Sequence, residues 1–238
     1  MKNLNGKKVI VTGGTRGIGF AIATRLKHEG ATVHITGTQP TSSLSSDFIY
    51  HGVDFTAPQQ VAKFSAVLAQ QEPDILINNA GINVVNPFCD IELSDFSRLH
   101  QVNVEAPFQF CQAVVPGMKR KGWGRIVNIT SIWSKLSKAG RASYSASKFA
   151  IDGMTAALAA EVAEYGILAN CVAPGFIETD LTKEILGEAG MSEMKKQVPM
   201  KRLGKPEEVA ALVAWLVGVE NTYISGQNIV IDGGFTRV

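Results

Sequence analysis

The stretch "VIVTGGTRGIG", residues 9–19, places a glycine-rich turn between a β-branched run and a helical pattern. Gly13, Gly17 and Gly19 stand where a backbone can come close to a ligand, and the first turn of a helix offers free N–H groups at that point. The spacing is TGxxxGxG rather than the commoner GxGxxG. Glycines also serve ordinary tight turns, so it is the position between strand and helix that favours a pyrophosphate-binding turn.

The rest of the chain repeats this alternation of short β-branched runs and longer helical patterns. Strands that alternate with helices predict parallel pairing with crossovers, so we expect an α/β fold: a doubly wound, Rossmann-type parallel sheet with helices on both faces, in a single domain over 1–238. Strands are expected within 7–13, 32–37, 48–54, 74–81, 124–131, 168–175 and 228–234, and helices within 17–30, 57–71, 94–119, from 142 onwards and within 206–219.

Two segments interrupt this alternation. Residues 38–46, "TQPTSSLSS", are too short and too rich in Ser and Thr for a crossover helix, which predicts a loop or one helical turn. Residues 179–203 form an insertion without strand character after the core strands. We interpret this insertion as a substrate lid.

The composition is that of a soluble protein with a sizeable core. Hydrophobic residues make up 45% and charged residues 18%, which argues against disorder, and a net charge of +2 gives no reason to expect nucleic acid or an anionic membrane as partner. No apolar run reaches the roughly 18 residues of a membrane span, and we expect no signal peptide. Three widely spaced cysteines predict reduced thiols in the cytoplasm, and no histidine pairs with another ligand at metal-binding spacing.

The residues around the glycine turn indicate which dinucleotide it binds. An acidic residue at the end of the second strand would bind the ribose hydroxyl of NAD, but 35–40 reads "ITGTQP". Arg16 and Thr38 instead suit the extra phosphate of NADP(H), although Arg16 could equally be a solvated surface residue. Asp54 could accept from the adenine amino group. Asn78, in "INNAG", fits either a ligand-binding strand end or a turn cap.

A second polar run, "YSASK" at 144–148, opens a long helical pattern. Tyr144 and Lys148 are four residues apart and therefore share a helix face, where an ammonium would lower the pKa of the phenol. Such a tyrosine can exchange a proton with a carbonyl oxygen. Ser131 can hold that oxygen by a hydrogen bond. Asn103, a poor helix former in mid-helix, would fit a functional duty such as holding a water beside Lys148.

These residues together resemble the short-chain dehydrogenase/reductase family over essentially the whole chain. A lone YxxxK pair can occur in any helix, whereas here seven features come in the family's order, with thirteen residues from Ser131 to Tyr144. The matches are "TGGTRGIG" at 12–19, Asp54, "NNAG" at 78–81, Asn103, Ser131, "YSASK" at 144–148 and "PG" at 174–175.

The resemblance implies a seven-stranded sheet and a catalytic set of Asn103, Ser131, Tyr144 and Lys148. It implies that Lys148 contacts the nicotinamide ribose. It also implies a homotetramer with the helices around 95–120 and 145–165 buried between subunits. The cofactor contacts that it implies are Gly13, Thr15, Arg16, Gly17, Ile18, Gly19, Thr38, Asp54, Phe55, Asn79, Ala80, Gly81, Tyr144, Lys148, Pro174, Gly175, Ile177 and Thr179, of which Ile177 and Thr179 would engage the carboxamide.

Within the family the chain most resembles 3-oxoacyl-[acyl-carrier-protein] reductases, through "APGFIETDLT", "VPMKRLGKPEEVA" and "YISGQNIVIDGG". That resemblance gives Arg125 a part in docking an acidic carrier protein, while Tyr165 stands where the group has a second basic residue. We therefore expect an NADP(H)-dependent oxidoreductase that interconverts a carbonyl and a secondary alcohol.

Residues 131–144, "SIWSKLSKAGRASY", depart from the pattern of that group and support a second hypothesis. Lys135, Lys138 and Arg141 are either solvated loop charges or a site that attracts an anionic substrate, and Trp133 is either a stacking ring or a subunit contact. The alternative substrate is a sugar, a sugar acid or a nucleotide-linked sugar. A catalytically silent nucleotide-binding regulator is the remaining hypothesis.

Overall fold

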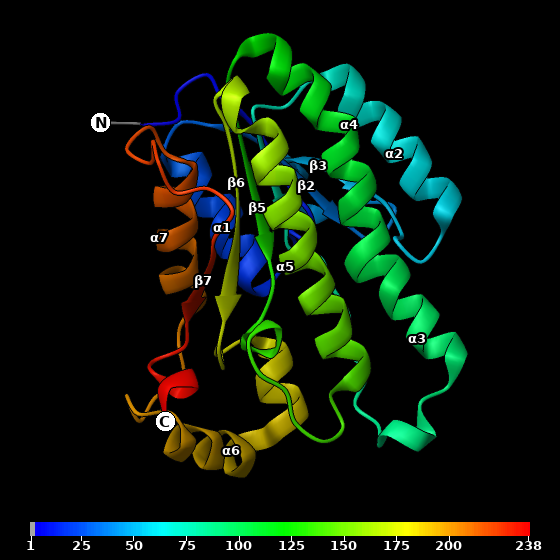
Figure 1. Ribbon diagram of the computed structural model, residues 1–238, viewed down its shortest axis with the longest axis vertical. Helices are drawn as coiled ribbons and strands as arrows, with labels where there is room; N and C mark the ends of the chain where they lie inside the picture. Colours follow the sequence, from blue (N-terminus) through cyan, green and yellow to red (C-terminus); the bar gives the residue numbers. More distant parts are fainter. Residues whose placement is uncertain (1–2) are drawn as a thin grey trace.

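The computed structural model describes residues 3–238, with the backbone alone at positions 45, 180, 181 and 183–186. Its centre is a sheet of seven parallel strands in the order β3-β2-β1-β4-β5-β6-β7 (Figure 1). The predicted sheet and all seven predicted strands are confirmed. The strands are β1 (Lys8–Val11), β2 (Thr32–Gly37), β3 (Ile49–Gly52), β4 (Ile75–Asn78), β5 (Gly124–Ile129), β6 (Ile167–Pro174) and β7 (Asn228–Ile231).

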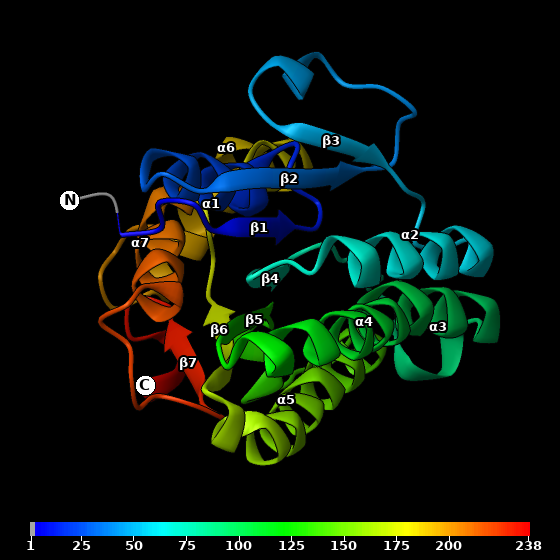
Figure 2. The same ribbon diagram turned by 90° about the horizontal axis from the view of Figure 1, so that it is seen from above.

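Helices cover both faces of this sheet (Figure 2). One face carries α1 and α7, and the other carries α2, α4 and α5. The helices are α1 (Gly17–His28), α2 (Pro58–Gln71), α3 (Leu93–His100), α4 (Ala106–Lys121), α5 (Ala142–Val162), α6 (Asp180–Gln197) and α7 (Pro206–Val217).

The two hydrophobic cores follow from the two-residue period of the strands. Val9 and Val11 of β1 point into the core on the side of α1 and α7, whereas Ile10 between them packs in the opposite core with Phe110 of α4. Both faces of a parallel sheet are buried in this way, which is why its strands are apolar runs without alternation. The sheet is therefore a rigid base for the loops at its ends.

The strand order reverses between β1 and β4, because β1 pairs with β2 on one side and with β4 on the other. In open α/β sheets the crevice at the carboxyl ends of such strands is where ligands bind. The segment 179–203 lies at this end of the sheet, where α6 runs below the strand arrowheads (Figure 1). It is helical, with a break at Gly187.

Two further elements refine the sequence predictions. Residues 38–46 contain one short 3₁₀ turn at Ser43–Ser46, as expected. The helix predicted over 94–119 instead consists of α3 and α4, joined by a π-helical turn at Gln101–Glu105 that contains Asn103. Single π turns inside helices are frequent at functional sites.

Candidate active site

The glycine turn after β1 is held by the ends of its two neighbouring strands. The Thr12 hydroxyl accepts from the backbone N–H groups of Asn79 and Ala80, each at 3.0 Å. The Asn79 side chain donates in turn to the carbonyls of Thr12 and Gly13, at 3.0 and 3.1 Å. Asn79 thus fixes the turn to the end of β4.

Glycine is required at Gly19, since a Cβ there would lie 2.2 Å from the Gly13 carbonyl oxygen and 2.4 Å from Asn79 Nδ2. The first turn of α1 has no capping side chain, so its N–H groups remain free to meet an anion. Gly17 faces Thr179, whose methyl carbon lies 3.5 Å from where a Cβ on Gly17 would stand. The start of α6 and the glycine turn are therefore neighbours, and the turn residues fit a bound pyrophosphate.

The predicted adenosine-side residues gather at the ends of β2 and β3. Thr15 packs over Gly37, and both Arg16 and Thr38 are exposed. The Asp54 carboxylate accepts from the backbone N–H and the hydroxyl of Thr56, at 2.9 and 2.8 Å.

Phe55 and Ile18 differ from these residues, because their side chains belong to the cores. The Phe55 ring is buried against Phe110, and Ile18 packs on the core beside α1. The buried Phe55 ring leaves its backbone as the part that can meet a cofactor, whereas Ile18 is only partly buried.

The predicted carboxamide-side residues follow β6. Pro174 ends β6, and the Gly175 N–H donates to the Ile231 carbonyl at 2.9 Å. Ile177 is buried, and Thr179 caps α6 by accepting from the Thr182 N–H.

Asn103 fixes the loop after β4 through its whole amide group. Its Oδ1 accepts from the Ile82 N–H at 2.9 Å, and its Nδ2 donates to the Ile82 carbonyl at 2.9 Å and to Ser147 Oγ at 3.2 Å. A Cβ on Gly81 would lie 3.2 Å from Asn103 Oδ1 and 3.6 Å from Lys148 Nζ. The π turn therefore brings Asn103 and Lys148 together at the end of β4.

Lys148 is buried, and its ammonium donates to the Ile129 carbonyl at 2.9 Å. Burial lowers its pKa to about 8, because a charged amine loses hydration there. The ammonium lies 5.5 Å from the centre of the Tyr144 ring, so the two side chains share one helix face as predicted.

Tyr144 differs from the sequence prediction in its acidity. Burial raises the pKa of its phenol, opposed by a hydrogen bond with Ser131 and by the charge of Arg141. The prediction that Lys148 lowers this pKa is wrong for these side chains, since desolvation dominates and Arg141 is the cation that acts on the phenol. The influence of Ser131 on this pKa places its hydroxyl close to the phenol.

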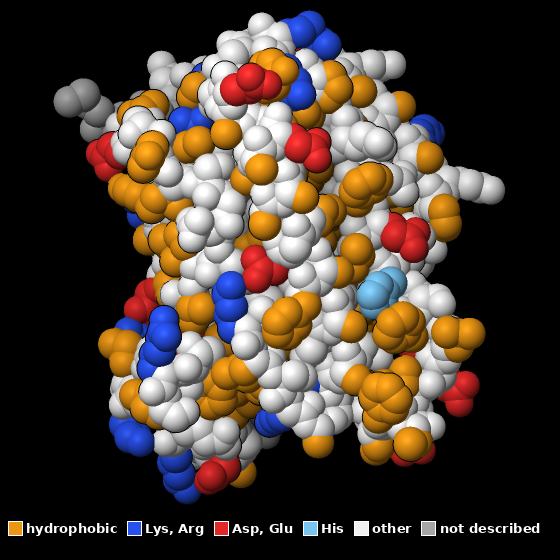
Figure 3. Space-filling view, in the orientation of Figure 1, with side chains coloured by type: hydrophobic (Ala, Val, Ile, Leu, Met, Phe, Trp, Pro, Cys, Tyr) orange, Lys and Arg blue, Asp and Glu red, His pale blue; other side chains and the backbone are white. Residues whose placement is uncertain are grey.

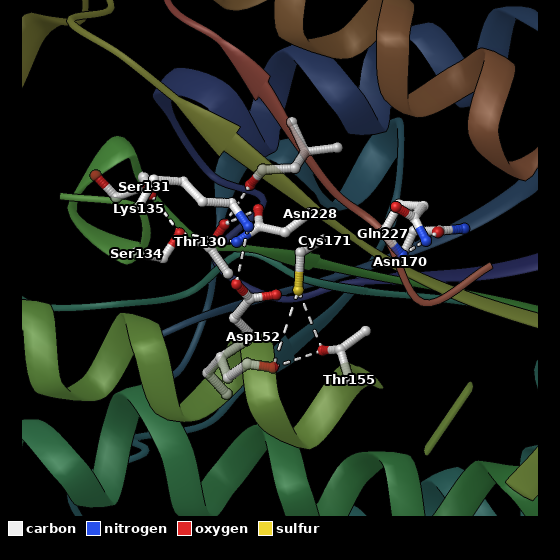
Figure 4. Close-up of polar contacts among 12 residues, drawn as sticks. Thr130, Ser131, Ser134, Lys135, Asp152, Thr155, Asn170, Cys171, Gln227 and Asn228 are labelled. Atoms are coloured by element: carbon white, nitrogen blue, oxygen red, sulfur yellow. Dashed lines mark hydrogen bonds and ion pairs between the residues drawn. The ribbon is translucent and has the colours of Figure 1, made fainter. Parts of the chain in front are cut away.

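Ser131 is held by a network that the sequence did not reveal (Figure 4). Ser134 donates to the Ser131 carbonyl at 2.6 Å, and Asn228 of β7 donates to the Ser134 hydroxyl at 2.9 Å. The side-chain oxygen Oδ1 of Asn228 accepts from the Thr130 hydroxyl at 3.0 Å. Only the adjacency of β6 and β7 brings Asn228 here, so no local sequence signal could have found it.

Asn78 belongs to the core: its side chain neither faces a ligand site nor caps a turn. Its amide donates to Asn128 Oδ1 at 2.8 Å and to the Cys111 sulfur at 3.5 Å, inside the protein. Arg125 is also buried, with 6% of its surface exposed, and donates to the carbonyls of Gly124, Gly166 and Asn221. The prediction that Arg125 docks a carrier protein is therefore wrong.

The mouth of the site is aromatic and cationic. Trp133 packs edge-on against Phe176 and Phe235, with ring centres 6.5 Å apart in both cases. Lys138 and Arg141 lie over the Trp133 ring, at 5.5 and 5.7 Å from its centre. Trp133 is buried within its own chain, where its ring packs against these two phenylalanines.

Residues that the sequence separates widely thus meet at one end of the sheet: the glycine turn, the Asn103 turn, and the Ser131, Tyr144 and Lys148 side chains. Such a fold and site define a nicotinamide-dependent oxidoreductase. In the described part of the chain, no helix is long and apolar enough to cross a membrane, and no group of three His, Cys, Asp or Glu side chains could hold a metal ion.

Comparisons with known proteins agree with this class. A family model described as enoyl-(acyl carrier protein) reductase matches residues 13–236. A 3-oxoacyl-[acyl-carrier-protein] reductase of Vibrio cholerae is 38% identical over 99% of this chain and 100% of its own length. A D-beta-hydroxybutyrate dehydrogenase of Rhizobium meliloti is 35% identical over 97% and 98% of the two chains.

The solved structures include a gluconate 5-dehydrogenase from Burkholderia cenocepacia in complex with NADP and tartrate. It superposes with a TM-score of 0.91 at 31% identity, covering 100% of this chain and 98% of its own. The chain belongs to the short-chain dehydrogenase/reductase family.

Proposed function

We propose that the protein interconverts a carbonyl and a secondary alcohol with NADP(H), and that Tyr144 transfers the proton. The observation that carries this proposal is that the ammonium of the buried Lys148 lies 5.5 Å from the centre of the Tyr144 ring, with the Ser131 hydroxyl near enough to lower the pKa of the phenol. When bound, the nicotinamide supplies or accepts the hydride. Ser131 holds the substrate oxygen, and Tyr144 gives this oxygen its proton in reduction and takes it back in oxidation.

The remaining side chains position the reactants. Lys148, whose pKa of about 8 leaves it largely protonated at pH 7, is placed beside Gly81 to contact the nicotinamide ribose. Asn103 holds this loop in place. The turn residues Gly13, Gly17 and Gly19 with the first turn of α1 would hold the pyrophosphate, and Ile177 and Thr179 the carboxamide.

The preference for NADP(H) over NAD(H) is supported at the end of β2. Residues 37–40 contain no carboxylate that would repel a phosphate, whereas Arg16 and Thr38 are exposed beside it. The side chain of Arg16 has no ion-pair partner among the described residues, so a phosphate would meet a free guanidinium.

The leading substrate is a compound of the 3-oxoacyl type, since relatives with that activity match over the whole chain. A sugar acid is the second candidate. It is supported by Lys138 and Arg141 at the mouth, neither of which has an ion-pair partner in the described part of the chain, and by the likeness to gluconate dehydrogenases.

The test is a steady-state assay of the purified protein with NADPH and with NADH. Acetoacetyl-CoA reports the first substrate class, and 5-ketogluconate the second. We expect reduction of at least one of them, with a higher kcat/KM for NADPH. If the protein reduced neither of these substrates, nor any carbonyl compound in a wider panel, the proposed activity would be refuted.

We further propose a cytoplasmic homotetramer, paired through the α4 and α5 face. Phe108 and Phe149 are half exposed on this face, where hydrophobic side chains show among polar ones (Figure 3). A shallow groove there is lined by Val104, Phe108 and Met154. Light scattering on the intact protein, compared with the double variant Phe108→Lys and Phe149→Lys, tests this: the variant should lose the tetramer.

A further inference from the structure

The three cations between Trp133 and Tyr144 are not equivalent. Lys135 forms an ion pair with Asp152 at 3.0 Å, so its charge is already balanced. Lys138 and Arg141 have no ion-pair partner in the part of the chain that the structure describes, and both lie over Trp133. The sequence allows these cations to be either solvated loop charges or a site for an anionic substrate. Lys135 is a paired surface charge, whereas Lys138 and Arg141 are available to bind a ligand.

Arg141 carries a second, independent sign of a missing partner. Its Nε atom is buried and has no hydrogen-bond acceptor among the described residues. A buried donor without a partner costs free energy, and planar guanidinium groups favour carboxylates, which accept from two of their N–H groups at once. The natural acceptor is therefore an oxyanion that comes from outside the chain.

The position of Arg141 ties this acceptor to the reacting centre. Arg141 precedes Tyr144 by three residues at the start of α5, and its charge acts on the phenol. Side chains three apart on a helix lie about 5–6 Å from each other at their Cβ atoms. A molecule of a few carbons can therefore place one oxygen at Tyr144 and a carboxylate at Arg141.

The surface behind Arg141 is rigid. Trp133, Phe176 and Phe235 pack mutually edge-on, with Phe176 and Phe235 at 5.0 Å, and a cation over such a ring is held without being neutralised. Lys138, which is exposed, adds a second positive charge at the entrance.

We infer that Arg141 binds the carboxylate of the substrate, and that the substrate is a small oxo acid or hydroxy acid with a free acid group. This inference rests on the proposed function but reverses the order of its two substrate classes, since it ranks free acids ahead of the 3-oxoacyl thioesters that the whole-chain relatives suggest. A thioester or an ester presents no negative charge at that place and offers the guanidinium only a neutral carbonyl oxygen, so a free acid is preferred to its uncharged derivatives.

The test compares matched pairs of substrates in wild-type protein, with NADPH in excess. The pairs are acetoacetate against methyl acetoacetate, and 5-ketogluconate against its methyl ester. For the better pair we expect wild-type kcat/KM to be at least tenfold higher for the acid. Arg141→Gln should raise KM for the acid at least tenfold and change the ester less than threefold, while Arg141→Lys should recover part of the loss.

Lys135→Gln is the matched control, because it removes a neighbouring cation that is already paired, and it should change neither substrate more than twofold. Unchanged turnover of the ester shows that the Arg141 variants are folded. Equal losses for acid and ester in Arg141→Gln would overturn the inference, as would a wild-type preference for the ester or for acetoacetyl-CoA.

If the wild type turns over neither member of a pair, the binding of 3-hydroxybutyrate and gluconate in the presence of NADP⁺ decides by calorimetry. Binding that Arg141→Gln abolishes supports the carboxylate site, and absence of binding by the wild type overturns it. The proposed function is judged separately, since reduction of acetoacetyl-CoA that is insensitive to Arg141→Gln would keep the function and remove only this inference.

Discussion

The innermost part of the candidate site, called here its floor, and the entrance, its mouth, differ in whether their polar side chains have partners. On the floor, Asn103 uses its amide in three hydrogen bonds, Lys148 donates to a backbone carbonyl, and Ser131 is braced from β7. At the mouth, Lys138 and Arg141 have no ion-pair partner among the described residues, and both lie over one tryptophan ring.

This difference separates two tasks. Groups that take part in every turnover gain from being positioned in advance, since little free energy is then needed to orient them. Groups that choose a substrate must keep free donors for it. Under the proposed function, the floor would determine the type of reaction and the mouth would determine the choice of substrate.

Gly19→Ala should have the largest effect on the floor. Its Cβ would overlap the Gly13 carbonyl and the Asn79 amide, and overpacking of this kind costs about 1–3 kcal/mol. Because the strain falls on the turn itself, we expect the affinity for NADPH to fall by about 5- to 160-fold, measured by fluorescence titration. Gly153→Ala in α5 is the control, since nothing lies within 4 Å of its Cβ; equal affinity losses in both variants would contradict this account.

Lys148→Met should make the protein more stable while removing its activity. The folded-state pKa of about 8 lies below the usual value of 10.5, so at pH 7 burial of the charge costs up to about 3 kcal/mol. Between pH 8 and 10.5 the unfolded chain binds more protons than the folded protein, and the stability of the wild type should rise with pH there.

Urea unfolding of the wild type and of Lys148→Met at pH 7 and pH 9.5 measures this effect. The gap between the two proteins should be largest at pH 7 and should narrow at the higher pH. A wild-type stability that falls over this range while that of the variant stays constant would show that the ammonium is not destabilised by burial.

Asn103→Ala tests the π turn. It leaves the N–H and carbonyl groups of Ile82 without partners, at about 1–3 kcal/mol for each buried group. We expect a lower midpoint of urea unfolding and a lower kcat, with a smaller change in KM. Asn103→Asp keeps the acceptor and should therefore lower the stability less than Asn103→Ala does. If Asn103→Ala kept full kcat, the turn would have no part in positioning Lys148.

Asn228→Ala should have the smallest effect. It removes the donor to Ser134 and the acceptor for Thr130, so Ser131 loses support without losing its hydroxyl. We expect kcat to fall about two- to tenfold with an almost unchanged KM for NADPH, in line with about 0.5–1.5 kcal/mol for one hydrogen bond. The adjacent Gln227→Ala serves as control and should retain wild-type kcat.

The sequence was sufficient to predict the sheet and to predict that its motifs lie at the same end of it. Each strand is an apolar run buried on both faces, and the glycine turn and the YSASK pair are local patterns whose placement the parallel topology dictates.

What the sequence did not reveal depends on contacts between distant residues. Asn228 and Ser134 are 94 positions apart, and His34 and His51, which lie 3.0 Å apart between β2 and β3, show no pairing in the sequence. Arg125 resembled a surface cation, although three carbonyls bind it inside the protein. The pKa of Tyr144 was assigned the wrong direction because a sequence shows a neighbouring charge but not the desolvation that opposes it.

The central claim is that the Tyr144 phenol carries the proton of the reaction, and single-turnover kinetics of Tyr144→Phe tests it most directly. The account predicts that the rate of NADPH oxidation by bound substrate falls at least about 100-fold, while the Kd for NADPH changes less than about twofold, because only the transferable proton is lost. A variant that oxidises NADPH at the wild-type rate would contradict it.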